Sequence, residues 1–167
     1  MILKSLQYHR HINFTQEWGI EGKDTDMVDF GNINLLVGKN AVGKSRTLVV
    51  IKELGQLLAS KITAEDVKFK SSVYHAVIGN GKRNIEYYLS LEGGVVKEEI
   101  VSEKGFVLFE RSSSRLYIEE TESYEKVTLN PKRTITQYES EEIPFLNFLV
   151  EWGFSVRDSF FADQIEK

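Results

Sequence analysis

Residues 32–45 read NINLLVGKNAVGKS and carry the strongest structural signal in the chain. Residues 32–37 form a short apolar run that ends at Gly38, a pattern typical of a buried strand that enters a tight turn. Residues 38–45 match G-x-x-x-x-G-K-[ST], the pattern of a phosphate-binding P-loop. A helix pattern begins at Lys44, so the sequence predicts both the strand and the helix that flank such a loop.

The helix after this loop is predicted to run for about 18 residues, because apolar side chains recur at steps of three and four. The residues of this stripe are Leu48, Ile51, Leu54, Leu58 and Ile62.

Two β regions flank this helix. The first thirty-odd residues read as extended segments. From Val73 onward, short strands alternate with glycine-bearing turns such as residues 92–94 and 103–105, which predicts an antiparallel meander. The gaps between these strands are too short for crossover helices. Pro144 and Gly153 bracket a further helix near the end of the chain.

We therefore expect one α/β domain with some α+β character. Its mixed sheet would carry the P-loop helix and the antiparallel meander. The predicted parts are β strands, P-loop and P-loop helix in residues 1–70, the meander in residues 71–137, and a helix with a tail in residues 138–167.

The residue types of the loop explain its predicted chemistry. Glycines at 38 and 43 allow the backbone to curl so that successive N–H groups point at a polyphosphate, and the helix N-terminus adds its positive end. Lys44 would contact the β- and γ-phosphates, and the Ser45 hydroxyl would ligate Mg²⁺. The residues expected to bind nucleotide are Gly38, Lys39, Asn40, Ala41, Val42, Gly43, Lys44, Ser45, Arg46 and Thr47.

ATP with Mg²⁺ is the expected cofactor. Proteins that bind GTP usually add an N-K-x-D motif that reads the base and a D-x-x-G switch, and neither occurs in this sequence. Residues 130–133 read NPKR and lack the aspartate that would bind guanine.

The strand and loop of residues 32–45, with Asn40 inside the loop, resemble the ABC-type ATPase heads of the SMC/RecF/OLD group, which are "AAA family" ATPases. Residues 3–6, LKSL, are similar to the first strand of such heads, and the predicted meander is similar to the one in their first lobe. The resemblance implies an ABC-type P-loop NTPase head lobe that binds ATP and acts with a second head.

Three elements of that family are missing from the sequence. No hydrophobic strand ends in Asp-Glu, no Leu-Ser-Gly-Gly-like signature is present, and no histidine follows His75. In the family these elements belong to the second lobe. The resemblance therefore implies that the chain is a first lobe alone, whether truncated, proteolysed or naturally split. A second lobe or partner head would supply the missing motifs in a dimer.

The family also has a glutamine that follows the meander and reaches the magnesium ion. Gln137 stands in the corresponding order along the chain and is a candidate for this role. An ordinary surface glutamine explains the same position equally well.

Composition limits the remaining possibilities. The 167 residues include 41% apolar and 28% charged residues and no cysteine, which indicates a globular protein without disulfides or zinc-thiolate sites. The sequence shows neither a membrane span nor a secretory signal, so we expect a cytoplasmic protein. The net charge of −4 comes from an acidic second half, which shows no DNA footprint, although the complete protein could still bind DNA.

The sequence thus favours ATP binding by this chain, with hydrolysis in the complete protein. Two alternatives stay open. A small-molecule or nucleoside kinase would use the same loop, but kinases usually begin with the P-loop strand. A non-catalytic module for nucleotide sensing or assembly would dock through the aromatic segment 145–161.

Overall fold

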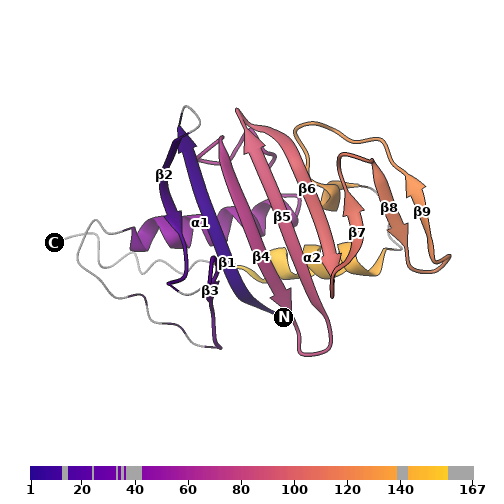
Figure 1. Cartoon of the computed structure of the whole chain (residues 1–167), viewed down its shortest axis with the longest axis horizontal. Coiled ribbons are helices and arrows are strands. Elements are labelled where there is room, and N and C mark those ends of the chain that lie inside the picture. The colour runs from indigo at the N-terminus through magenta and orange to yellow at the C-terminus, as the bar shows by residue number, and fades with distance from the viewer. Residues whose placement is uncertain are drawn as a thin grey trace.

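The computed structural model describes residues 1–12, 15–23, 25–32, 34, 36, 43–138 and 143–157. Nine strands form one open sheet, in the order β2-β1-β4-β5-β6-β7-β8-β9, with β3 also paired to β1 (Figure 1). The strands are β1 (Ile2–Ile12), β2 (Thr15–Ile20), β3 (Val28–Asp29), β4 (Ser72–Gly79), β5 (Asn84–Glu92), β6 (Val95–Glu103), β7 (Phe106–Glu110), β8 (Arg115–Ile118) and β9 (Ser123–Lys126). The helices are α1 (Lys44–Leu58) and α2 (Pro144–Ser155), with a 3₁₀ turn η1 (Ile135–Gln137) between β9 and α2.

Short turns make the second half of the sheet a meander, as the turn residues predict. Gly93 and Gly94 join β5 to β6 with φ values of 59° and 79°, and Lys104 and Gly105 join β6 to β7 with 51° and 80°. Two consecutive positive φ values are typical of the two-residue turns whose twist matches antiparallel strands.

The predicted α/β fold, a P-loop NTPase head lobe of ABC type with a mixed sheet, is wrong. Every strand pair in the described chain is antiparallel. The crossover through α1 leads from β3 to β4, and each of these strands pairs antiparallel with β1, which separates them. The crossover therefore creates no parallel pair, and the protein has an α+β architecture.

The strand expected at residues 32–37 is part of this correction. Its described residues, at 32, 34 and 36, lie outside the nine strands, and the others lie outside the described chain. A P-loop strand in a mixed sheet pairs with a parallel neighbour, and no strand pair among the described residues is parallel.

Both helices lie against the same face of the sheet (Figure 1). In β4 the side chains alternate between buried and half-buried, and Tyr74, Ala76 and Ile78 belong to the core that the helices cover. The two helices pack closely because Gly55 and Gly153 lack side chains. A Cβ on Gly55 would lie 2.8 Å from Cβ of Val156, and one on Gly153 would lie 2.6 Å from the backbone N of Ala59.

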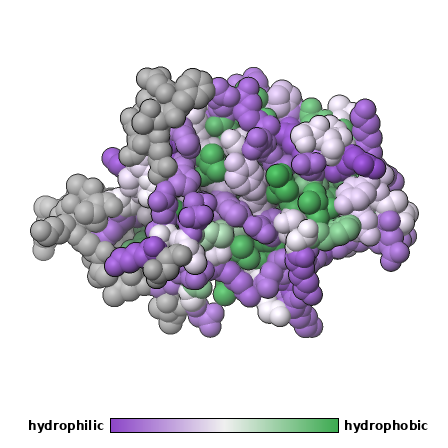
Figure 2. Space-filling model, in the orientation of Figure 1, coloured by the Kyte–Doolittle hydropathy of each residue, from purple (hydrophilic) through white to green (hydrophobic). Residues whose placement is uncertain are grey.

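The other face of the sheet is largely hydrophilic, with hydrophobic residues gathered toward β6 and β7 (Figure 2). At this end of the sheet Phe106 and Tyr124 are 48% and 39% exposed, and their rings stack with centroids 6.3 Å apart. Within the described ranges, neither helix has the length and apolar content needed to cross a bilayer.

Candidate functional site

Of the predicted nucleotide-binding residues 38–47, the structure describes residues 43–47, which form the start of α1. Gly43 adopts a left-handed conformation, with φ 94° and ψ 9°, and α1 begins at the next residue, Lys44. The first helical hydrogen bond runs from Thr47 N–H to Gly43 O at 2.9 Å, and the Thr47 hydroxyl donates to the same oxygen at 3.1 Å. Glycine suits position 43 because its φ lies in a region that L side chains rarely adopt.

Among the described residues, no side chain caps the N-terminus of α1. No side chain at Gly43 accepts a hydrogen bond from the first turn, and the first turn contains no acidic residue. This helix start carries the positive end of the helix dipole, which favours an anionic partner. Ser45 and Arg46 are exposed at this end, and Lys44 is half-buried. Backbone N–H groups and the cationic side chains of Lys44 and Arg46 therefore lie together at this helix end.

Trp18 of β2 forms one wall beside this helix end. A Cβ on Gly43 would lie 2.9 Å from Nε1 of the indole, and the guanidinium carbon of Arg46 lies 5.9 Å from the ring centre. Trp18 in turn packs against the buried ring of Tyr8, with centroids 5.8 Å apart. Sequence reasoning missed Trp18, because 24 residues (19–42) separate it from Gly43 and no local spacing joins them.

The structure brings together only part of the predicted set. Gly43, Lys44, Ser45, Arg46 and Thr47 follow one another at the start of α1. The other five predicted residues lie outside the described residues, and these are Gly38, Lys39, Asn40, Ala41 and Val42.

Gln137 lies at the opposite end of α1 from Ser45. Its side-chain Nε2 donates to Ile62 O at 2.9 Å, and Ile62 follows the C-terminus of the helix. A helix of 15 residues spans about 22 Å at 1.5 Å per residue. The structure therefore does not bring Gln137 and Ser45 together around a common ion.

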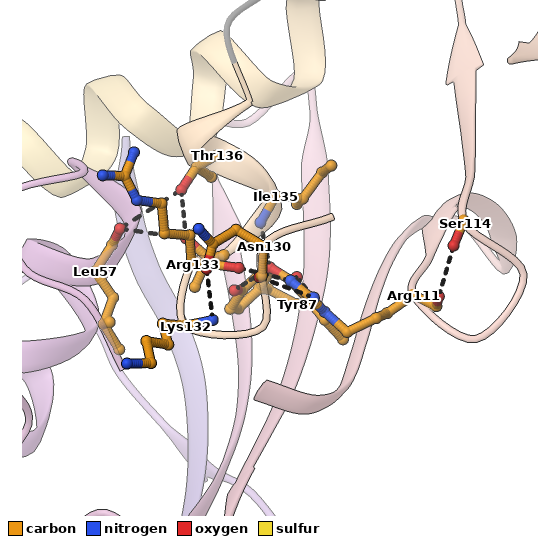
Figure 3. Close-up of polar contacts among 11 residues, drawn as sticks. Leu57, Tyr87, Arg111, Ser114, Asn130, Lys132, Arg133, Ile135 and Thr136 are labelled. Atoms are coloured by element: carbon orange, nitrogen blue, oxygen red, sulfur yellow. Dashed lines mark hydrogen bonds and ion pairs between the residues drawn. The ribbon is translucent and has the colours of Figure 1, made fainter. Parts of the chain in front are cut away.

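A buried network fixes the segment that carries Gln137. The carboxylate of Glu99 is 1% exposed and accepts hydrogen bonds from Tyr87 Oη at 2.7 Å and from Ile135 N–H at 2.8 Å. It also accepts a hydrogen bond from Arg111 Nη2 at 2.9 Å, and the same nitrogen donates to Arg133 O at 2.6 Å (Figure 3). Burial raises the pKa of the Glu99 carboxyl, and the Arg111 guanidinium opposes that rise. The network joins β5, β6 and the chain before η1.

Other places on the described chain are less suited to binding a phosphate group or its metal ion. No group of three or more His, Asp and Glu side chains there could hold a metal ion. A cavity of about 580 Å³ opens over β4, β5 and β6, and its lining combines Lys97 with Glu92 and Glu98. Its carboxylates disfavour a polyanion. The start of α1 is therefore the candidate site.

Comparison with models of protein families, with curated proteins and with solved structures finds no match.

Proposed function

We propose that residues 38–47 bind the phosphates of ATP, with Mg²⁺ as the accompanying ion. The observation that carries this proposal is the left-handed conformation of Gly43, which leads directly into the start of α1 at Lys44. The P-loop sequence pattern needs a helix at this position, because the first N–H groups of that helix bind phosphate oxygens. The proposal depends on this loop and helix, not on a parallel P-loop sheet.

Each described residue has a chemical role in this proposal. The Lys44 ammonium neutralises the β- and γ-phosphates, and the Ser45 hydroxyl ligates Mg²⁺. The backbone N–H groups of Arg46 and Thr47 are directed to the α-phosphate. The absence of acidic residues from the first turn of α1 favours this arrangement, because a carboxylate there would compete for the same N–H groups.

Hydrolysis would need groups from a second lobe or partner head, as in the SMC/RecF/OLD ATPases that the motif resembles. Two exposed apolar residues near the loop support a partner of this kind. Leu36 lies before the loop and is 40% exposed, and Leu48 lies one turn inside α1 and is 52% exposed. A partner lobe would cover both side chains. Because the sequence lacks the Asp-Glu and signature motifs of such heads, the chain alone should bind ATP and hydrolyse it slowly.

Trp18 provides a direct assay of binding. The protein has two tryptophans, Trp18 beside Gly43 and Trp152 buried in α2, so the Trp152→Phe variant leaves one reporter at the site. Mg·ATP should change the Trp18 fluorescence of this variant in a saturable titration.

Adding Lys44→Ala should weaken binding about 10- to 100-fold, because a charged hydrogen bond is lost. The matched control is Lys97→Ala, which removes an exposed lysine on the sheet. Equal affinity in the Lys44→Ala and Lys97→Ala proteins would contradict the assigned site.

A further inference from the structure

Three buried oxygen atoms between α1 and the sheet find no hydrogen-bond partner among the described residues. They are Oε2 of Glu53 on α1, Oη of Tyr8 on β1 and Oη of Tyr74 on β4. Glu53 is 8% exposed, and both tyrosines are fully buried. None of the three belongs to the proposed nucleotide site.

The three groups occupy one compartment. The rings of Tyr8 and Tyr74 meet edge to face, with centroids 4.9 Å apart. The carboxyl of Glu53 acts electrostatically on both phenols and raises the pKa of each, although burial is the larger cause. The two phenols are therefore in contact, and Glu53 on the facing helix is near enough to act on both electrostatically.

Neighbouring polar groups are already committed to other partners. Oε1 of Glu53 accepts a hydrogen bond from Lys68 N–H at 2.7 Å. The Ser72 side chain acts on both phenols and lowers the pKa of each, but its single hydroxyl hydrogen is donated to Phe69 O at 3.0 Å. Ser72 therefore has no hydrogen left to donate, and it cannot by itself satisfy Oη of Tyr8, Oη of Tyr74 and Oε2 of Glu53.

Buried polar atoms in folded proteins are nearly always paired, either with protein groups or with internal water. We propose that this compartment binds an internal water molecule that bridges Oε2 of Glu53 to the hydroxyls of Tyr8 and Tyr74. A buried water typically makes about three hydrogen bonds to groups that otherwise have no partner, which is the number available here. The water would link the helix of the proposed nucleotide site to two central strands.

Water fits the compartment better than a cation. Burial raises the pKa of the Glu53 carboxyl, which favours its neutral form. Only one of the three groups can carry a negative charge, so the site could not balance a buried divalent ion, whereas a water molecule needs no counter-charge.

The direct test is a crystal structure of the whole chain at a resolution that shows ordered water. The expected result is a water oxygen within about 3.2 Å of Oε2 of Glu53 and of at least one phenol oxygen. A direct hydrogen bond between a phenol and Glu53, with no water between them, would overturn the proposal. A bound ion, identified by its anomalous signal after soaking in rubidium or thallium salts, would also overturn it.

Unfolding equilibria give a second, independent test. Tyr8→Phe and Tyr74→Phe should each lower the folding equilibrium constant about fivefold, because each removes a hydrogen bond to the bound water. Tyr138→Phe, which removes an exposed hydroxyl, is the control and should leave the constant unchanged. If the phenols are dry and unpaired, both core variants will instead be as stable as the wild-type chain or more stable, and the proposal fails.

Discussion

Gly43 connects backbone geometry to the proposed site at the scale of a single residue. Its φ of 94° and its contact with Trp18 both exclude a side chain. Gly81 provides a matched control, because its φ is 87° and a Cβ there would meet nothing within 4 Å.

We expect Gly81→Ala to cost about 1–2 kcal/mol from backbone strain alone. Gly43→Ala should cost at least 1 kcal/mol more, as an order of magnitude for a forced clash in packed surroundings. Urea unfolding of both variants measures the difference. Equal losses of unfolding free energy in the two variants would show that Trp18 does not contact Gly43 closely in solution.

Glu53 makes the stability of the protein depend on pH. Burial raises the pKa of this carboxyl in the folded state above its usual value of 4.5. Between 4.5 and the raised pKa the folded state binds more protons than the unfolded state, so the free energy of unfolding falls as pH rises through this window. Below this window Glu53 is neutral in both states, and its contribution does not change with pH.

Replacing Glu53 with Gln should flatten the part of this slope that belongs to Glu53. Part of the slope should remain, because burial also raises the pKa of Glu99. Chemical denaturation of wild type and Glu53→Gln at pH 4 to 7 compares the slopes, and identical slopes would contradict an elevated pKa at Glu53.

At the scale of elements, the Glu99–Arg111 pair holds the chain before η1 against the sheet. Arg111→Ala would leave a buried carboxylate without its cation, and we expect a loss of about 3–5 kcal/mol. The exposed pair Lys132–Glu65, with side chains about half exposed, is the control, and Lys132→Ala should cost about 0–1 kcal/mol. Thermal unfolding of both variants measures the contrast, and similar losses would contradict the structural role of Arg111.

Local signals in the sequence predict individual elements well. The glycines at 93, 94 and 105 mark the two hairpin turns around β6. The helix predicted from Lys44 is α1, but it ends at Leu58 after 15 residues, so Ile62 of the predicted stripe lies beyond it, and Leu48 is 52% exposed. The last hairpin pairs β8 (Arg115–Ile118) with β9 (Ser123–Lys126). Residues 119–122 connect these two strands in a tight turn, in which Glu122 has a positive φ.

Glu99 shows why the burial of a polar residue cannot be predicted from the sequence pattern alone. It follows Lys97 and Glu98 and reads as part of a solvated face. A register shift between Ser90 and Leu91 changes the alternation of β6, so that Val96 and Glu99, three positions apart, are both buried. A period of two cannot predict this, because the shift arises from pairing with another strand.

At the scale of the whole molecule, the prediction of a mixed sheet was wrong, although the antiparallel meander within it was correct. Strand direction depends on which strands become neighbours, and β1 lies between β3 and β4. Local patterns in residues 1–70 contain no information on that arrangement. The position of Trp18 beside Gly43 has the same origin, because β2 occupies the edge of the sheet next to β1.

The central claim is that the start of α1 binds the phosphates of a nucleotide. A crystal structure of the chain with Mg²⁺ and a non-hydrolysable ATP analogue tests this most directly. The account predicts phosphate oxygens within hydrogen-bond distance of the backbone N–H groups after Gly43, with the Lys44 ammonium on the β- and γ-phosphates. Saturating nucleotide that leaves this helix end without phosphate, or binds elsewhere on the chain, would contradict it.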